Sequence, residues 1–419
     1  MTAEIAVMNR SGVALAADSA VTVSFPERGD GLDRTPKIYT ANKLFMLSKY
    51  EPIGIMINGS ASILGIPWEL IIKEYRRQLG ETSFPRVLEY CNDFVHHLNN
   101  NLEYFPKELQ ASYFAQSLVE HLSDVLVNVN DDLTQLVKDG HIADEAAFEK
   151  ATEERLISHL KDHVAEIGAL ADSNCIDIDE TRFFNDYEIA IDGAQDRLLE
   201  MVGGTIQSTK DLRDVLNSLA YFVATKETLG STSVESGVVI AGYGSSEIYP
   251  SLIALGVEGV IDNHLKYEIV NRREESRNAL IVPFAQADMI HMFMEGVSPE
   301  YRRLVESYLE KVFRDKLPQI ADTLIGEFRQ HAAAAARQYG SQPILDAVEM
   351  LPVHELASMA ETLVNLTSFR RRVTPDQETV GGPVDVAVIT KGDGFIWIQR
   401  KHYFDVEKNP HFLTNYYRG

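Results

Sequence analysis

The chain has 419 residues, of which 45% are hydrophobic and 24% are charged, as in an ordinary globular protein. Its 62 acidic and 39 basic residues give a formal net charge of −23, which argues against binding to nucleic acid or to an anionic membrane. No apolar run approaches the roughly 20 residues that a membrane-spanning helix needs, and the N-terminus lacks the basic region of a signal peptide. We therefore expect a cytoplasmic protein with neither a nucleic-acid nor a membrane partner.

Short apolar runs separated by turn residues predict strands in the first sixty residues. The runs Ile5–Met8 and Val13–Ala17 flank a polar turn and predict a buried hairpin. Three more runs, at residues 37–39, 43–47 and 53–57, suit the inner strands of a covered sheet.

Apolar residues recur at helical spacing after Gly59. This spacing predicts one helix over residues 63–75 and a second over residues 84–98. From about residue 103 to residue 226 the sequence is helical and acidic, and only the stretch 172–186 breaks the pattern.

The second half of the chain returns to strands and then to helices. Strands are predicted at residues 234–241, 247–255, 257–270, 279–284, 384–390 and 395–398. Helices are predicted at residues 287–295, 299–314, 317–337 and 353–372. Because the two types come in blocks, we predict an α+β fold of packed antiparallel sheets with helices outside them.

Thr2 is the first residue with a chemical signal, because it directly follows the initiator Met1. Removal of Met1 would leave a threonine whose hydroxyl and free amine belong to the same residue. A free α-amine has a pKa of about 7.7–8.0 and can act as a general base for that hydroxyl near neutral pH. Threonine is also common at position two for other reasons, so Thr2 alone does not identify an N-terminal nucleophile.

The surroundings of Thr2 resemble the opening of proteasome β-subunits, and most closely that of the bacterial proteasome-like proteases. Thr2–Val7 and Ser11–Ser19 match its first two strands, and Asp18 lies sixteen positions after Thr2, as the family's acidic residue does after its nucleophile. Lys43 with the run 53–60 looks like the family's lysine strand and the next strand with its glycine. Gly381–Thr390 resembles the closing strand.

This resemblance implies a role for each matching residue. Thr2 would supply both the attacking hydroxyl and the amine that takes its proton. Lys43 would be a fixed cation beside the hydroxyl, and Asp18 would orient Lys43. The N–H of Gly59 would face the developing oxyanion. Thr22 and Ser60 would contact the substrate. Asp376 and Thr379 would help to place the terminal amine.

Several alternatives stay open at the level of sequence. Asp18 is also the type of residue that ends a strand, and Lys37 competes with Lys43 for the catalytic place. The family carries a serine where this chain has Val282–Asp288, which contains none. Either the proton path around the amine differs, or Gln286 or Asp288 replaces that serine.

The resemblance implies a four-layer αββα sandwich of two antiparallel sheets, as in N-terminal-nucleophile (Ntn) hydrolases. Residues 1–102 and 231–419 would form this core, and the acidic helical stretch 103–230 would be a large insertion.

The implied activity is a threonine hydrolase that cleaves peptide or amide bonds of a peptide or protein substrate. The alternatives are a non-catalytic scaffold subunit and an Ntn amidohydrolase of a small amide. Such folds assemble into rings, so we predict a homo-oligomer. An ATP-driven unfoldase is a partner by analogy alone, and no residue of the chain indicates one.

We predict neither a metal nor a cofactor. Cys91 and Cys175 lie far apart, and His96 and His97 are adjacent, so none of them has zinc-ligand spacing. The chain also has no glycine-rich phosphate loop.

Overall fold

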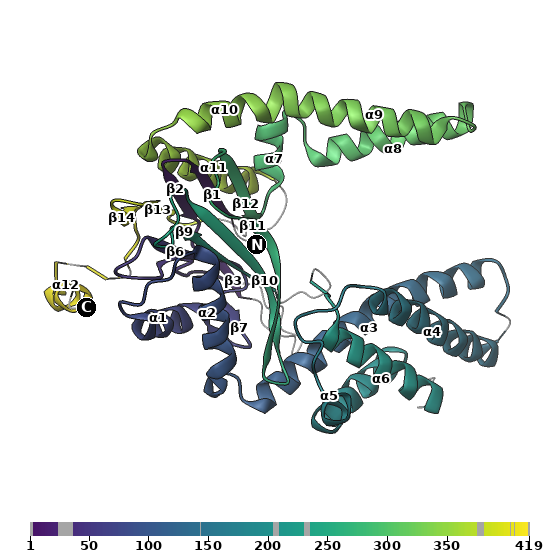
Figure 1. Cartoon of the computed structure of the whole chain (residues 1–419). Coiled ribbons are helices and arrows are strands. Elements are labelled where there is room, and N and C mark those ends of the chain that lie inside the picture. Colours follow the sequence, from purple (N-terminus) through teal and green to yellow (C-terminus); the bar gives the residue numbers. More distant parts are fainter. Residues whose placement is uncertain are drawn as a thin grey trace.

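Two five-stranded antiparallel sheets form the centre of the protein (Figure 1). The computed structural model describes residues 3–23, 37–142, 144–203, 209–229, 235–374, 381–402, 404–405 and 407–417. In spatial order the first sheet contains β12 (Leu280–Ala285), β1 (Ala3–Asn9), β2 (Gly12–Ala17), β13 (Asp385–Thr390) and β14 (Gly394–Gln399). The second contains β11 (His264–Arg273), β10 (Ser251–Ile261), β9 (Ser236–Gly242), β6 (Ile53–Gly59) and β5 (Leu44–Met46). Two short hairpins, β3 (Ala20–Val23) with β4 (Lys37–Thr40) and β7 (Ser62–Ile63) with β8 (Ile66–Pro67), adjoin them.

The two sheets share an apolar layer because strand residues alternate between faces. Met8 and Leu15 of the first sheet belong to the same buried cluster as Met56 and Leu252 of the second. β1 and β2 are buried along their whole length. Their sequences therefore read as continuous apolar runs rather than as alternating ones.

Helices pack on the outer face of each sheet. On the first sheet, Ile5 and Val7 contact the cluster formed by α10 (Gln342–Met350) and α11 (Val353–Val373). On the second sheet, Ile55 and Ile240 share a cluster with α1 (Trp68–Leu79) and α2 (Val87–Asn100). The predicted helices 63–75 and 84–98 thus correspond to α1 and α2, with each boundary shifted by a few residues.

The acidic stretch folds into a helical block with its own apolar core. Residues such as Phe114, Leu122, Leu160 and Leu219 make up that core. Its helices are α3 (Lys107–Lys138), α4 (Glu145–Gly168), α5 (Glu180–Met201) and α6 (Lys210–Thr225). The predicted break over 172–186 ends earlier than expected, because Asp179 caps α5 by accepting a hydrogen bond from the Arg182 amide.

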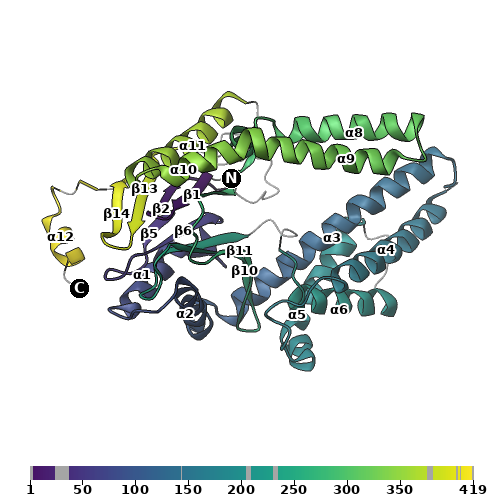
Figure 2. The ribbon, with the colours of Figure 1, turned by 45° about the horizontal axis from the view of Figure 1, so that its top comes forward.

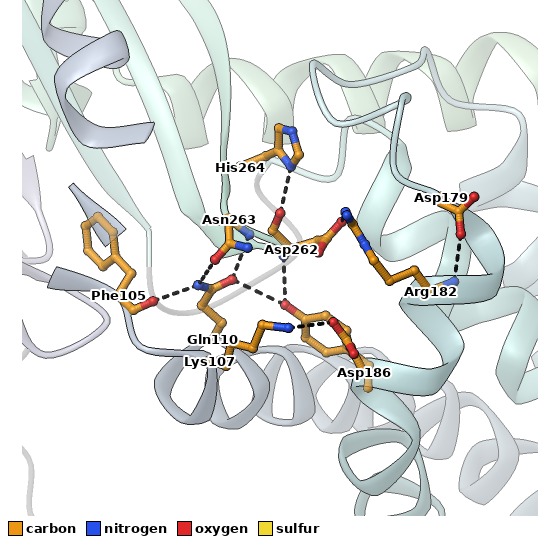
Figure 3. Close-up of polar contacts among 10 residues, drawn as sticks. Phe105, Lys107, Gln110, Asp179, Arg182, Asp186, Asp262, Asn263 and His264 are labelled. Atoms are coloured by element: carbon orange, nitrogen blue, oxygen red, sulfur yellow. Dashed lines mark hydrogen bonds and ion pairs between the residues drawn. The ribbon is translucent and has the colours of Figure 1, made fainter. Parts of the chain in front are cut away.

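Polar contacts attach the helical block to the β10–β11 hairpin (Figure 3). The Gln110 side chain donates to the Asn263 side chain at 2.9 Å and accepts from the Asn263 amide at 2.9 Å. The Tyr187 hydroxyl accepts from the Asp262 amide at 2.8 Å, and Arg182 forms an ion pair with Asp262. Buried amides at the hairpin turn are thereby satisfied by side chains of the block.

A second helical projection leaves the first sheet after β12. It contains α7 (Asp288–Glu295), α8 (Pro299–Lys316), α9 (Ala321–Ala335) and the π-helical turn η2 (Ala336–Ser341), and it leads into α10. We call α8 and α9 the helical arm. The arm and the helical block extend to the same side of the sheets (Figures 1 and 2). The remaining short helices are η1 (Leu102–Tyr104) and α12 (Pro410–Tyr417).

Two of the predicted boundaries of strands and helices are wrong. The predicted break between the strands 247–255 and 257–270 falls inside β10. Gly256 does not mark a turn there, because its lack of a Cβ makes room for the Leu229 side chain, which a Cβ would meet at 2.3 Å. The true turn is at Asp262 and Asn263, both with positive φ. The helix predicted over 317–337 is α9, and helical structure continues through η2 and α10 to Met350.

The α+β class with antiparallel sheets is confirmed by these strand pairings. None of the helices in the described part of the chain combines the length and apolar character that crossing a bilayer requires.

Candidate functional site

Asp18 lies at the end of the β1–β2 hairpin, next to the first described residue of the chain. The Asp18 amide donates to the Ala3 carbonyl at 3.0 Å. In return the Ala3 amide donates to Asp18 Oδ1 at 3.1 Å. Because the Ala3 nitrogen is bonded to the carbonyl carbon of Thr2, this carboxylate is fixed at the start of the chain.

Lys43 precedes β5 in the second sheet and reaches across to Asp18. Its Nζ lies 2.6 Å from Asp18 Oδ1, and both side chains are almost fully buried. A second carboxylate belongs to the same group, since Glu4 Oε1 lies 3.2 Å from Lys43 Nζ. We call Glu4, Asp18 and Lys43 the Lys43 cluster.

The C-terminal part of the chain completes the surroundings of Asp18. The Gly381 amide donates to Asp18 Oδ2 at 2.9 Å. The Gly381 carbonyl in turn accepts from the Ser19 and Ala20 amides at 3.3 and 3.1 Å. Asp18 thus accepts hydrogen bonds from backbone N–H groups as well as from the ammonium of Lys43, so both of its carboxylate oxygens have partners.

Gly59 ends β6 in a conformation that favours glycine. Its φ is +71°, and a Cβ at this position would lie 2.5 Å from the Glu235 carbonyl oxygen. The next residue, Ser60, donates its amide to that same oxygen at 2.9 Å, and its hydroxyl donates to the Ser62 carbonyl at 2.8 Å. This turn brings a backbone segment close to the start of β9.

Several predicted site residues lie outside the described residues: Thr2, Asp376 and Thr379. Thr22 is part of β3, and its backbone pairs with Ile38. The side chains of Thr22 and of the competing Lys37 are also outside the described part. Of the predicted residues, the structure therefore brings Asp18 and Lys43 into direct contact.

The segment without a serine runs beside the beginning of β1. Ala285, the last residue of β12, pairs with Ala3 and has a φ of +61°. Gln286 is buried and accepts a hydrogen bond from the Arg371 side chain. A polar cavity of about 150 Å³ opens here. Its lining residues include Gln286, Asp288, Arg370 and Arg371.

Glu4 was missed by reasoning from the sequence, although a signal was present. It is the only charged residue of Ala3–Asn9, a strand whose other side chains are almost all apolar. An acidic residue in such a strand is expected to have a buried cationic partner. The contact of Gly381 with Asp18 had no comparable signal, because it is made by the backbone alone.

Comparisons with known proteins do not assign the chain to a family. No protein-family model matches the chain, and no curated protein matches it. Among solved structures, the helical assembly of the Anbu complex from Pseudomonas aeruginosa is similar over 100% of this chain and 97% of that chain, with 9% identity and a TM-score of 0.28. A likeness this weak carries no argument.

The family predicted from the sequence resemblance is therefore corrected. Membership of the proteasome β-subunit-like group, or of its bacterial proteasome-like branch, is contradicted because no family model matches and the structural similarity is too low to supply one. A function for this chain must accordingly rest on the geometry of its described residues.

Within the described residues, no group of three or more histidine, cysteine, aspartate or glutamate side chains is arranged to hold a metal ion.

Proposed function

We propose that the protein is a threonine hydrolase that cleaves peptide or amide bonds through Thr2 after removal of Met1. The observation that carries the proposal is the buried ion pair of Lys43 and Asp18, with 2.6 Å between Nζ and Oδ1. Asp18 also accepts the amide of Ala3, the residue bonded to Thr2. The desolvation of a buried lysine–aspartate pair offsets most of the free energy gained from its attraction. The presence of such a pair next to Ala3 therefore favours a functional role over a purely stabilising one.

The proposed reaction is acyl transfer in two steps. The Thr2 amine takes the proton of the Thr2 hydroxyl as its oxygen attacks the substrate carbonyl carbon. The amine then passes this proton to the leaving nitrogen, the amide C–N bond breaks, and an ester remains on Thr2. Water then attacks the ester carbonyl carbon and gives a proton to the amine. The amine returns this proton to the Thr2 oxygen as the acyl C–O bond breaks, which releases the acid and restores the free hydroxyl and amine.

The described residues would assist without changing their own charge. The Lys43 ammonium favours the negative charge that develops on the attacking oxygen, while Asp18 holds that ammonium in place. The Gly59 amide is the proposed donor to the oxyanion of the tetrahedral intermediate. Thr22 and Ser60 are the proposed contacts to the substrate main chain, and Asp376 and Thr379 the proposed groups that place the amine.

The arrangement of layers supports an Ntn-hydrolase architecture as part of the same proposal. An apolar layer between the two sheets and helical clusters on both outer faces are what a four-layer αββα sandwich needs. We propose that residues 1–102 and 231–419 make up this core. The stretch 103–230 would then be an insertion.

Mass spectrometry of the purified protein after reaction with an epoxyketone or β-lactone probe tests the proposal. We expect loss of Met1, one added probe per chain, and no labelling of the Thr2→Ala variant. Asp18→Asn should lower the labelling rate at least about 100-fold, the loss typical of removing one preorganised charge-stabilising group. Asp93→Asn, which alters a carboxylate bonded to the Tyr75 hydroxyl in another part of the fold, is the matched control.

Retention of Met1 would refute the proposal, because the amine would then be blocked. In that case a non-catalytic scaffold is the second candidate. The absence of serine from Val282–Asp288 favours it. An amidohydrolase of a small amide is the third, and it would label with the probe but cleave no peptide.

A further inference from the structure

Glu4 is a buried acidic side chain that packing alone does not explain. It is 1% exposed, and it lies in β1 between Ala17 of β2 and Phe284 of β12. Placing a carboxylate among apolar strands costs several kcal/mol unless another charge compensates it. A residue that lowers stability at such a position indicates a role in the neighbouring site.

The contact that defines this role is with Lys43. Lys43 Nζ lies 3.2 Å from Glu4 Oε1 and 2.6 Å from Asp18 Oδ1. A lysine side chain has four rotatable bonds and is otherwise free to move its charge by several ångströms. Two carboxylates, Glu4 in β1 and Asp18 directly after β2, restrict the ammonium to one location.

The position of Glu4 along β1 gives it a second effect. Consecutive Cα atoms are about 3.8 Å apart, so the Cα atoms of Glu4 and of the proposed nucleophile, two residues earlier, lie within about 8 Å of each other. A negative charge at that distance stabilises the protonated form of an amine. The proposed base must be unprotonated to accept the hydroxyl proton, so Glu4 would set the pH at which it becomes available.

We propose that Glu4 is a positioning residue of the Lys43 cluster, which holds the Lys43 ammonium and raises the pH at which the N-terminal amine becomes an active base. This inference rests on the proposed function. The charged groups that face Glu4 include Lys43 and, through Lys43, Asp18.

The test is the rate of β-lactone labelling of Thr2 as a function of pH between 5 and 9. We expect the acid side of the profile of Glu4→Gln to move about one pH unit lower, so that labelling at a fixed acidic pH becomes roughly tenfold faster. Glu4→Asp, which keeps the charge, should retain the wild-type midpoint. Glu4→Met serves as a second neutral variant if Glu4→Gln does not fold.

Glu258→Gln is the structural control. Glu258 is also a buried glutamate paired with a lysine, Lys266, at 2.8 Å, but it lies where the second sheet meets the helical block. Its substitution should reduce stability without moving the pH profile. A Glu4→Gln profile that coincides with the wild-type profile would overturn the inference and leave the proposed function intact. Wild-type protein that is not labelled would overturn both.

Discussion

At the level of single residues, Gly59 shows how backbone geometry limits substitution at the site. A Cβ at Gly59 would meet the Glu235 carbonyl oxygen at 2.5 Å, and the residue has a positive φ. Both effects oppose any L side chain. The first would also displace the backbone amide that we propose as the oxyanion donor.

We therefore expect Gly59→Ala to destabilise the protein by more than the roughly 1–2 kcal/mol that positive φ alone costs, and to abolish probe labelling. Gly65→Ala is the matched control, because Gly65 has a φ of +81° but nothing within 4 Å of a built Cβ. Urea unfolding of both variants measures the difference. Equal losses of stability in the two would show that the close contact at Gly59 has no effect.

The central pair of the site was implied by the resemblance to a known family, and its neighbours were not. Asp18 and Lys43 match that family's pattern in their positions relative to Thr2 and to the strands, and the structure brings them within hydrogen-bonding distance. Glu4 was overlooked because a strand residue was assumed to serve packing. Gly381 contacts Asp18 through its backbone amide, which any residue but proline carries, so no side chain indicated it.

At the level of elements, a buried ion pair holds the helical block against the second sheet. Lys266 Nζ donates to Glu258 Oε2 and to the Val223 carbonyl, each at 2.8 Å, and also to the Thr228 hydroxyl. Both charged side chains are almost fully buried. The pair therefore links α6 with the β10–β11 hairpin where solvent cannot replace either partner.

Lys266→Met should cost about 3–5 kcal/mol, because Glu258 would keep a buried charge with no cation beside it. The Lys266→Met/Glu258→Leu double variant should recover much of that loss. Lys226→Met, which breaks a more exposed pair with Asp172, should cost no more than about 1 kcal/mol. Denaturant unfolding measures all three, and additive effects of the two substitutions would contradict the coupling.

A histidine pair, His121 buried and His163 partly buried, makes the α3–α4 contact sensitive to acid. His121 Nδ1 and His163 Nε2 lie 3.1 Å apart. Burial, together with the neighbouring His163, lowers the pKa of His121 to about 4. An unfolded imidazole binds a proton below about pH 6.5, so between the two values the unfolded chain holds more protons than the folded one.

The stability of the helical block should therefore fall as the pH decreases from about 6.5 to about 4, by roughly 3 kcal/mol at most. His121→Leu should remove most of this dependence. His331→Leu, at an exposed position on α9, should leave it unchanged. Hydrogen exchange of α3 and α4 amides at several pH values gives the measurement, and an unaltered slope in His121→Leu would refute the assignment.

Element types were more predictable than element ends. Periodicity located the strands and helices of the core, since each buries one continuous face. It failed at Gly256, where glycine admits the Leu229 side chain instead of forming a turn. It also ended a helix at residue 337, whereas helical structure continues through η2, where Gly340 allows close approach to the Met294 carbonyl. Glycine can form a turn or make room for a close contact, and only the tertiary contacts distinguish these two roles.

At the level of the whole molecule, the helical arm exposes an apolar face that suits an assembly. α8 has no buried residue in the described chain, and Tyr301, Leu304 and Tyr308 are each more than 60% exposed. These residues recur at i, i+3 and i+7, so they lie on one side of the helix. α2, by contrast, packs its apolar side against the second sheet.

We expect the protein to form a homo-oligomer. In the Leu304→Asp/Tyr308→Asp variant the mass of the assembly in solution should be lower, while the circular dichroism spectrum should not change. Ile189→Asp is the control, because Ile189 is equally apolar and 87% exposed but lies on α5. Light scattering at micromolar concentration measures the mass. A wild-type monomer would contradict the prediction.

The groups that hold Asp18 are spread along the chain, and this has a consequence for biosynthesis. Asp18 is held by groups from residue 3, residue 43 and residue 381, and β13 pairs with β2 beside it. A growing polypeptide on the ribosome lacks the last of these until residue 381 has been translated. Products that stop before this residue should accordingly be inert, and a reactive terminus would arise only after it has been added.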